Sequence, residues 1–371
     1  MKKYIKYAPI AALAALATLA SCASSTDSDV ITMLVGTYTY DTSHGIYSFA
    51  FNQQNGSFQV LDSAEIANPS YLCISPDAQH VYSITESGEN SSVSAFYFDA
   101  ATGSLSLINT VPADADPCHI ALIPGNRLCI ANYSGGTVGI YNIADDGSLA
   151  DDYRNIAFSA PVGPDTIRQK SAHMHFTILS PDGKMLLAND LGTDRIHRLD
   201  ISGDSVRVLD DVSVTPGYGP RHSAFSPDGK MLYLLNELSG HICSFRYDSG
   251  SLSLCEDVAA DEANGRGSAD ITISPDGRFL YATHRLVNDG ISIFAIDANN
   301  GKLSKVGYYK TGIHPRNFII TPNGKYLLVA CRDDNNIEVL QRDSETGTLT
   351  PTGNTIKVPR PVCIKFAQKA K

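Results

Sequence analysis

The stretch that decides the fold is Ser226-Pro227-Asp228-Gly229, which lies between the apolar runs His222–Phe225 and Met231–Leu235. Proline at the second position of a turn and glycine at the fourth are typical of a type I turn. Two more apolar runs follow, at Ile242–Tyr247 and Leu252–Cys255, and all four alternate as strands do. The sequence from residue 222 to residue 255 therefore predicts four consecutive strands joined by short turns.

The same unit occurs six times along the chain. Each copy carries a proline in its first turn, and these residues are Pro76, Pro124, Pro181, Pro227, Pro275 and Pro322. The successive intervals are 48, 57, 46, 48 and 47 residues. A repeat of this length made of strands is typical of a β-propeller, in which blades surround a central channel. We assign the one long interval, after Pro124, to a loop between blades around residues 161–164.

The two ends of the repeat region complement each other. Residues 31–61 supply the second, third and fourth strands of a unit, whereas residues 360–366 are similar to a first strand. We therefore predict an all-β fold, a seven-bladed β-propeller with four antiparallel strands per blade and a last blade closed by both termini. Such closure leaves no unpaired sheet edge.

The N-terminal segment has the features of an export signal. A basic start with Lys2, Lys3 and Lys6 precedes an apolar stretch at residues 8–20, and Leu19-Ala20-Ser21-Cys22 has the form of a lipoprotein processing site. We predict a signal peptide at 1–21, lipidation of Cys22, a polar tether at 22–30 and the propeller at 31–371. The protein would be exported and lipid-anchored to the cell envelope, as a periplasmic or outer-membrane lipoprotein. A plain secretory peptide is the alternative.

The charge of the processed chain limits its partners. The sequence has 29 basic and 39 acidic residues, a formal charge of −10, and removal of the three lysines of the signal leaves 26 basic residues and −13. An acidic surface repels nucleic acid and anionic lipid. We therefore expect no nucleic-acid partner, membrane contact only through the lipid anchor, and a monomer. The seven cysteines after Cys22 include no Cys-x-x-Cys pair, and we interpret them as core thiols.

Alignment of the repeats on their turns gathers polar residues at equivalent positions. The column at the start of the first strand contains Ser70, Cys118, His175, Arg221, Ala269, Arg316 and Val362. Two residues earlier, and on the same side of the strand if side chains alternate, are Asn68, Asp116, His173, Gly219, Gly267, His314 and Arg360. The column at the end of the second strand contains Glu86, Tyr133, Asp190, Glu237, Arg285 and Arg332.

Equivalent positions of a propeller converge at its axis, so these columns predict one mixed cluster of imidazole, guanidinium and carboxylate groups. Such a cluster suits the binding of an anionic substrate and the transfer of a proton. The alternative is a ring of satisfied salt bridges that fills the channel.

Five segments of the chain share a further pattern, namely residues 172–175, 189–195, 219–222, 235–238 and 314–318. Together they resemble the lactonase propeller family, which contains bacterial 6-phosphogluconolactonases of the propeller type and fungal carboxymuconate-lactonizing enzymes. The resemblance extends from about Ile31 to Phe366. It implies a seven-bladed fold and a site of one histidine, two arginines and one glutamate, which match His173 (with His175 as its rival), Arg221, Arg285 and Glu237.

The resemblance implies hydrolysis of a sugar lactone, as in a 6-phosphogluconolactonase. This reaction needs an activated water and a stabilised oxyanion. His173 or Glu237 can act as the base, and Arg221 and Arg285 can stabilise the oxyanion and clamp the acidic end of the substrate. We expect further substrate contacts from five residues: His175, Asp190, His222, His314 and Arg316.

Two other functions are compatible with parts of the sequence. Four side chains could offer oxygens to calcium, namely Glu86, Asp190, Asn68 and Asp116. Three arginines among them, Arg221, Arg285 and Arg332, disfavour a dication, so we expect no metal and no other cofactor. A non-catalytic propeller that captures a carbohydrate or a protein at the cell envelope is the second alternative. Export favours it, because a phosphorylated sugar lactone is a cytosolic metabolite.

Overall fold

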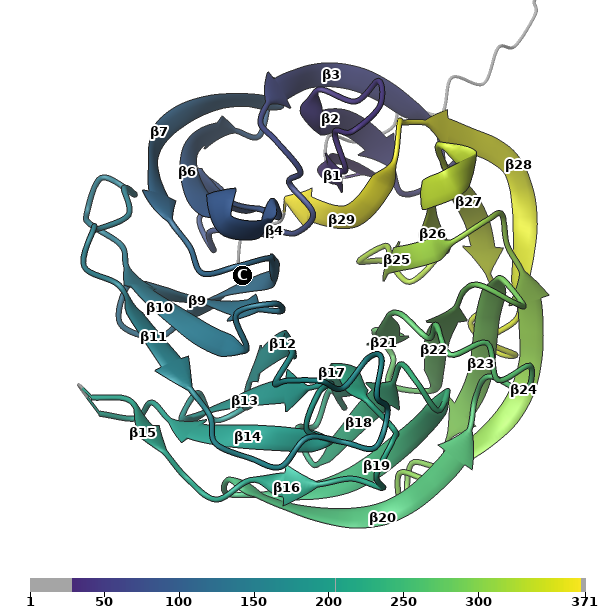
Figure 1. The fold of residues 1–371 in the computed structure, drawn as a ribbon. Coiled ribbons are helices and arrows are strands. Elements are labelled where there is room, and N and C mark those ends of the chain that lie inside the picture. The colour runs from purple at the N-terminus through teal and green to yellow at the C-terminus, as the bar shows by residue number, and fades with distance from the viewer. Residues whose placement is uncertain (1–28, 204, 368–371) are drawn as a thin grey trace, which may run out of the picture.

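The computed structural model describes residues 29–203 and 205–367, which form seven sheets arranged in a ring around a central channel (Figure 1). The predicted all-β, seven-bladed propeller is confirmed. The predicted signal peptide at 1–21, the lipidation site Cys22 and the tether up to residue 28 lie outside the described residues.

Each blade has its first strand next to the axis and its last strand at the rim. Blade 1 contains β4 (Leu72–Ile74), β5 (His80–Thr85), β6 (Ser92–Asp99) and β7 (Ser104–Pro112). Blade 2 contains β8 (Pro117–Ile123), β9 (Arg127–Asn132), β10 (Thr137–Asn142) and β11 (Arg154–Ala157). Blade 3 contains β12 (Met174–Leu179), β13 (Met185–Asp190), β14 (Arg195–Asp200), β15 (Arg207–Val208) and β16 (Val212–Ser213). Its outer edge is divided, because β15 and β16 both pair with β14.

The remaining complete blades follow the same order. Blade 4 contains β17 (Pro220–Phe225), β18 (Met231–Asn236), β19 (His241–Asp248) and β20 (Ser251–Ala259). Blade 5 contains β21 (Ile271–Ile273), β22 (Phe279–His284), β23 (Gly290–Ile296) and β24 (Leu303–Lys310). Blade 6 contains β25 (Pro315–Ile320), β26 (Tyr326–Cys331), β27 (Asn336–Arg342) and β28 (Leu349–Lys357). Two short 3-10 helices, η2 (Gly88–Asn90) and η3 (Arg332–Asp334), follow β5 and β26.

Blade 7 closes the ring with both ends of the described chain. The C-terminal strand β29 (Pro361–Ala367) pairs antiparallel with β1 (Val30–Thr37), and β2 (Gly45–Asn52) and β3 (Phe58–Glu65) complete the sheet in the order β29-β1-β2-β3. Figure 1 shows this yellow strand beside the purple strands. The predicted closure by both termini is confirmed.

The Ser-Pro-Asp-Gly turn fixes the register of each blade. In blade 4 the Ser226 hydroxyl donates to Asp228 Oδ1 at 2.6 Å and accepts from the Met231 amide at 3.0 Å. The Gly229 amide donates to the Ser226 carbonyl at 2.8 Å, and Gly229 has φ +72°, a conformation that favours glycine. The turn therefore satisfies its own polar groups and places β17 opposite β18.

Neighbouring blades are joined by apolar side chains and by a repeated tyrosine contact. The buried aliphatic and aromatic residues form clusters between successive sheets. In blade 4 the Tyr233 hydroxyl donates to the Gly301 carbonyl of blade 5 at 2.8 Å, and Tyr281 of blade 5 donates to Gly347 of blade 6 at 2.8 Å. This contact satisfies a buried hydroxyl and holds the hairpin of the next blade.

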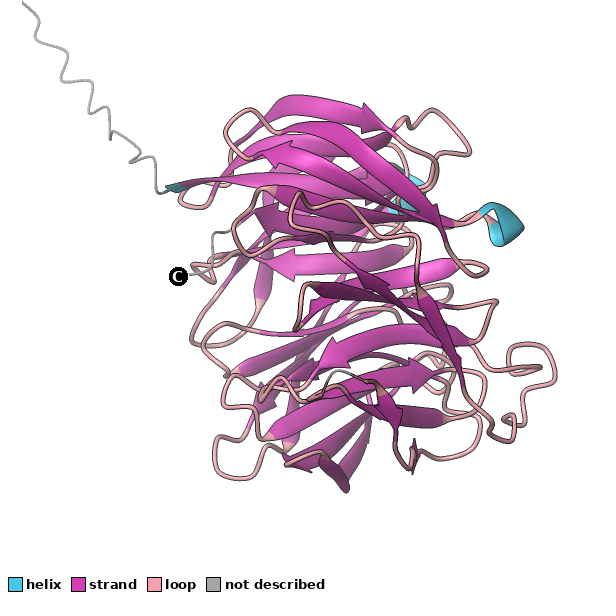
Figure 2. Ribbon diagram, turned by 90° about the vertical axis from the view of Figure 1, so that its left-hand side faces the viewer, coloured by secondary structure: helices cyan, strands magenta, loops and turns pink. Residues whose placement is uncertain are grey.

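The channel has two different ends. We call the end at which the innermost strands begin the front, and the end at which they stop the rear. Figure 1 views the front, and Figure 2 shows from the side that both ends of the described chain emerge at the rear (Figure 2). No helix within the described residues is long and apolar enough to cross a membrane.

Candidate active site

The column at the start of the first strands consists largely of β-bulge residues. The pairing of β12 with β13 skips His175, that of β17 with β18 skips Arg221, and that of β25 with β26 skips Arg316. Cys118 of β8 is skipped in the same way. A bulge removes one residue from the ladder and re-aims its side chain, often beside an active site. The bulge is thus the local feature that turns these side chains toward the front of the channel.

The residues two positions earlier do not follow the predicted alternation. Five of them precede the first strand in a left-handed conformation, with φ between 42° and 69°: Asn68, Asp116, Gly219, His314 and Arg360. Strand alternation requires extended backbone, so it does not apply at these positions. The expectation that the two columns share one side by alternation is therefore wrong, and each of these side chains reaches its place through a turn.

Glu237, which follows β18, is the centre of the ionic cluster at the front. Its Oε2 accepts from Arg221 Nε at 2.8 Å and lies 3.5 Å from Arg285 Nη2, and its Oε1 accepts from Arg168 Nη2 at 2.6 Å. Glu237 is 4% exposed. Burial alone would raise the pKa of this carboxyl, but the charges of the three arginines outweigh it and lower the pKa to about 2. Glu237 is therefore a carboxylate across the physiological pH range.

The main chain before β21 holds the two buried arginines in place. Arg221 Nη1 donates to the Ala269 carbonyl, and Arg285 Nε donates to the Gly267 carbonyl at 2.7 Å. Because blade 5 fixes both side chains and Glu237 connects them, their guanidinium groups are pre-oriented without a bound ligand. Preorganised positive groups of this kind stabilise negative charge at little cost in reorganisation.

His173 presents a free ring nitrogen at the front. Its Nδ1 lies 3.0 Å from the Tyr133 carbonyl, which can only accept, so Nδ1 carries the proton and Nε2 is an acceptor. The ring stacks on Tyr133 with centroids 4.4 Å apart and an interplanar angle of 11°. The His173 amide donates to Asp190 Oδ1 at 2.7 Å, which fixes the main chain. The half-buried imidazole is thus oriented from both sides.

His175, the rival of His173, lies deeper. It is 5% exposed, its Nε2 is 3.9 Å from Glu237 Oε2, and its Nδ1 faces the Cys118 thiol at 3.8 Å. Burial and the charge of Arg221 lower the pKa of His175 well below its ordinary value. His175 is therefore an uncharged side chain that lies beside the Glu237 carboxylate, deeper in the channel than His173.

Sequence reasoning missed Arg168, which comes from the long loop between β11 and β12. Its Nη2 contacts both Glu237 and the Tyr133 hydroxyl, the latter at 3.2 Å, and 35% of its side chain is exposed. Gln169 holds the loop, because its buried side chain donates to the Leu191 carbonyl at 2.8 Å. The signal was the interval of 57 residues, which marks this loop as the one insertion of the ring.

Blades 6, 7 and 1 complete the charged front. His314 Nε2 lies 3.2 Å from Arg285 Nη1, and Arg332 Nε donates to Asp333 at 2.8 Å. The Arg316 guanidinium lies over the ring of Tyr38, whose hydroxyl donates to Glu86 at 2.9 Å. We call this set the front cluster, and its charged members are Arg168, Arg221, Arg285, Arg316, Arg332, Glu86, Glu237 and Asp333. Among these eight side chains, five arginines against three carboxylates leave two positive charges in excess, and Arg360 at the edge also donates to Asp333, at 2.6 Å.

Two of the expected substrate contacts lie behind this cluster. Asp190 is fully buried, and its oxygens accept from the His173 amide, the Thr193 hydroxyl at 2.7 Å and His197 Nε2 at 3.2 Å. His222 donates from Nδ1 to Asp270 at 2.8 Å, and burial together with the charge of Arg221 lowers its pKa to about 4. The geometry gives Asp190 a positioning role for His173.

Little space remains near the middle of the channel axis. A cavity of about 10 Å³ lies on the axis, and its walls include Tyr71, His175, Arg221, His222 and Arg316. A space of this size holds about one water molecule at most. The front is therefore the wider approach to the front cluster for a molecule larger than water.

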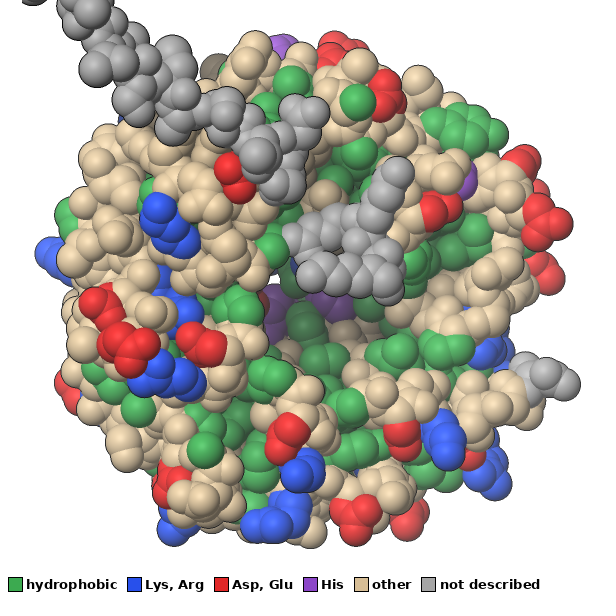
Figure 3. Space-filling model, turned by 180° about the vertical axis from the view of Figure 1, so that it is seen from behind, with side chains coloured by type: hydrophobic (Ala, Val, Ile, Leu, Met, Phe, Trp, Pro, Cys, Tyr) green, Lys and Arg blue, Asp and Glu red, His purple; other side chains and the backbone are tan. Residues whose placement is uncertain are grey.

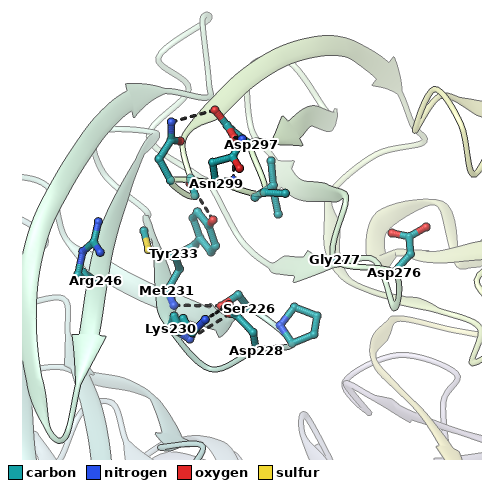
Figure 4. A pocket seen from close by; sticks show the side chains of 15 residues that line it. Ser226, Asp228, Lys230, Met231, Tyr233, Arg246, Asp276, Gly277, Asp297 and Asn299 are labelled. Carbon is teal, nitrogen blue, oxygen red and sulfur yellow. Dashed lines mark hydrogen bonds and ion pairs between the residues drawn. The ribbon is translucent and has the colours of Figure 1, made fainter.

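Other recesses and clusters differ in character. Figure 4 shows a recess of about 310 Å³ between blades 4 and 5, where Asp228, Asp276 and Asp297 are engaged by their own turns (Figure 4). No group of three or more His, Cys, Asp or Glu side chains suited to a metal ion occurs among residues 29–203 and 205–367. The seven cysteines of the described chain are free thiols, with Cys255 exposed, Cys73 half-buried and the other five buried.

Comparison with known proteins agrees with this architecture. The family description "Lactonase, 7-bladed beta-propeller" matches residues 32–366. The chain belongs to this lactonase family. A 6-phosphogluconolactonase of Formosa agariphila is 37% identical over 334 residues, which are 85% of this chain and 94% of that protein. The predicted family and enzyme class, a carboxylic-ester hydrolase of the lactonase type, are confirmed.

Two solved structures of this lactonase family are also similar. A proposed 6-phosphogluconolactonase of Bacteroides fragilis has 49% identity and a TM-score of 0.89, and covers 92% of this chain and 99% of its own. The periplasmic gluconolactonase of Pseudomonas aeruginosa has 31% identity and a TM-score of 0.85, with coverages of 91% and 99%. Full-length relatives thus include proteins named for phosphorylated and for unphosphorylated substrates.

Proposed function

We propose that this lactonase hydrolyses an anionic aldonolactone, as a 6-phosphogluconolactonase does, at the front cluster. The observation that carries the proposal is Glu237 joined to three arginines beside His173, whose Nε2 is an open acceptor. The excess of two positive charges supports an anionic substrate, and the names of the relatives support a lactone.

His173 is the base in the proposed mechanism. Its Nε2 takes a proton from a water molecule, whose oxygen bonds to the carbonyl carbon of the lactone. The protonated ring keeps its Nδ1–H on the Tyr133 carbonyl, which stabilises the imidazolium. Glu237 is a weak base with a pKa of about 2, so its part is to align the arginines rather than to accept this proton.

Arg285 stabilises the oxyanion of the tetrahedral intermediate. Its contact with Glu237 is long, at 3.5 Å, so the fixed Nη2 can donate to a developing negative oxygen without loss of a short hydrogen bond. Arg221, in short contact with Glu237, keeps this carboxylate in place. Cleavage of the bond between the carbonyl carbon and the ring oxygen follows, His173 returns its proton to that oxygen, and an open-chain carboxylic acid results.

The more exposed arginines bind the anionic arm of the substrate. Arg168 is one-third exposed, and Arg316 and Arg332 are half-buried at the same end of the channel. A guanidinium fork fits a carboxylate or phosphate through two hydrogen bonds. We therefore expect a phosphorylated aldonolactone to be hydrolysed with a lower KM than its unphosphorylated counterpart.

The test measures proton release from 6-phosphoglucono-δ-lactone and from glucono-δ-lactone, each corrected for spontaneous hydrolysis. The expected result is hydrolysis well above background, a preference for the phosphorylated lactone, and no effect of a chelator. Hydrolysis no faster than background with both lactones contradicts the proposal and favours the non-catalytic binding propeller.

We also propose that the chain is exported and anchored through a lipid on Cys22. The motif Leu19-Ala20-Ser21-Cys22 after a basic and then apolar segment supports this. Mass spectrometry of the protein from its own cell envelope should show a chain that begins at a lipidated Cys22. Cys22→Ala should abolish the lipid modification, and recovery of an unprocessed or unmodified natural chain contradicts the proposal.

A further inference from the structure

The rear end of the channel is a hollow of about 400 Å³, a volume typical of small-molecule sites. Its walls are the ends of four innermost strands, with residues 72–74 of β4, 119–122 of β8, 176–179 of β12 and 365–366 of β29. We call it the rear hollow. Figure 3 looks into this end and shows hydrophobic side chains around the opening and histidine side chains inside it (Figure 3).

Most residues that line the rear hollow are apolar, and polar groups enter it from His119, Thr177 and Lys365. Leucine, isoleucine and phenylalanine side chains form most of the lining, and Lys365 is its one positively charged member. His119 is neutral, because burial lowers its pKa well below the ordinary value. Its Nδ1 is already engaged with the Thr177 hydroxyl at 3.1 Å. The hollow therefore offers a single cation in a largely hydrophobic lining, and few of its hydrogen-bonding groups are free.

The Lys365 ammonium has an aromatic neighbour but no carboxylate. Its Nζ lies 4.4 Å from the ring centroid of Tyr71. None of the ion pairs formed by the described residues includes Lys365, and Asp270 on the same axis is taken by His222 at 2.8 Å and by Asn317 at 2.6 Å. Burial would lower the pKa of Lys365, but Tyr71, Cys363 and the more distant carboxylate of Asp270, which forms no ion pair with it, raise it above its ordinary value. A charged, half-buried ammonium without a carboxylate is suited to an anion from outside.

We propose that the rear hollow binds a small amphipathic monocarboxylate, with the carboxylate on Lys365 Nζ and the apolar body along the ends of β8 and β12. One cation matches one negative charge. A sugar or a dianionic phosphate would leave polar groups without partners against the aliphatic wall, which costs binding free energy. This inference does not depend on the proposed lactonase activity, because no residue that lines the rear hollow belongs to the front cluster.

The test uses octanoate as the probe and isothermal titration calorimetry of the full chain. We expect saturable binding, and binding about tenfold weaker in Lys365→Met, because a hydrogen bond to a charged group is lost. Octanamide, which has the same body and no charge, should bind the natural protein and Lys365→Met equally. Lactone hydrolysis should not change in Lys365→Met, since this residue lies outside the front cluster.

Two controls locate the site. Leu122→Trp should block octanoate by filling the hollow, whereas Arg168→Ala, which removes a cation from the front cluster, should leave its affinity unchanged. A crystal soaked with 8-bromooctanoate should show anomalous signal in the rear hollow. Equal affinity in Lys365→Met, signal only at the front, or no binding at millimolar concentration overturns the proposal.

Discussion

The front cluster and the rear hollow lie at opposite ends of the innermost strands, and they have opposite chemistry. On β12 the bulge residue His175 faces Glu237, while Thr177 to Leu179 line the apolar hollow a few residues later. On β8 the bulge residue Cys118 is likewise followed by the aliphatic residues 120–122. The difference lies in the backbone: where the ladder is interrupted, side chains converge on a reactive cluster, and where it is regular they form an apolar wall.

The largest expected effect comes from His173→Ala. Loss of the proposed base should lower kcat by about 10²–10⁴-fold with little change in KM, because proton transfer and not binding is lost. Stopped-flow or pH-stat rates with the phosphorylated lactone, corrected for background, provide the measurement.

His119→Gln is the matched control at the other end of the channel, since His119 is also an imidazole on an innermost strand. Its kcat should remain near that of the natural protein. An equal loss in both variants would mean that the two ends are not functionally distinct.

Arg285→Lys should have the next largest effect. The ammonium keeps the charge but lacks the planar fork that contacts Gly267, His314 and an oxyanion together, so we expect a loss of about 10²-fold in kcat. Initial rates over a range of substrate concentrations separate this loss from a change in KM. Activity close to that of the natural protein would show that Arg285 does not stabilise the oxyanion.

Glu237→Gln tests the stability of the front cluster. Removal of a buried carboxylate leaves its arginines uncompensated, which typically costs about 3–5 kcal/mol in the free energy of unfolding. Urea unfolding at pH 7 measures this cost. The other end should be unaffected, so octanoate binding by the folded variant serves as the control.

The same carboxylate predicts how stability depends on pH. The pKa of Glu237 is lowered from 4.5 to about 2, so the unfolded chain binds the proton more readily than the folded chain. The stability that Glu237 supplies is present above pH 4.5 and is lost as the pH falls through about 2. Glu237→Gln should therefore show a shallower loss of stability between pH 5 and pH 2 than the natural protein, and identical slopes would contradict the depressed pKa.

Arg168→Ala should have the smallest effect of these substitutions. One-third of the side chain is exposed, so its ion pair with Glu237 should contribute about 1 kcal/mol or less to stability. Its loss should raise KM for the phosphorylated lactone severalfold, more at low salt than at high salt. Arg207→Ala, which breaks a surface pair with Asp200, is the matched control and should leave KM unchanged.

The sequence allowed the ring and the members of the front cluster to be predicted because both follow from the repeat. The length of the repeat identifies the blade, and the Ser-Pro-Asp-Gly turn fixes the register of its strands. Arg221, Glu237 and Arg285 stand at equivalent or neighbouring positions of their repeats, which places them near one axis. Arg168 could not be found this way, since its loop is an insertion without a counterpart in the other blades.

The orientation of individual side chains was less predictable. Strand alternation assumes an unbroken ladder, whereas the bulge at His175 and the left-handed residue at His314 both break it. The hydrogen bonds that occupy the Asp190 carboxylate could not be predicted for another reason. Its partners Thr193 and His197 lie in the turn and on the opposite strand of the same hairpin, and their bonds depend on the exact path of that turn. Position along a repeat identifies neighbours, but which of them keeps a free nitrogen depends on tertiary hydrogen bonds.

The closure of blade 7 has a practical consequence for how the molecule can be attached to a support. Val30 and Ala367 both leave the ring on the face away from His173 and Arg285. A fusion partner, a bead or any other object joined directly at Val30 or Ala367 would sit behind the disc and leave the opposite opening unobstructed. Immobilisation through one end should therefore preserve substrate access, whereas coupling through side chains at the opening should not.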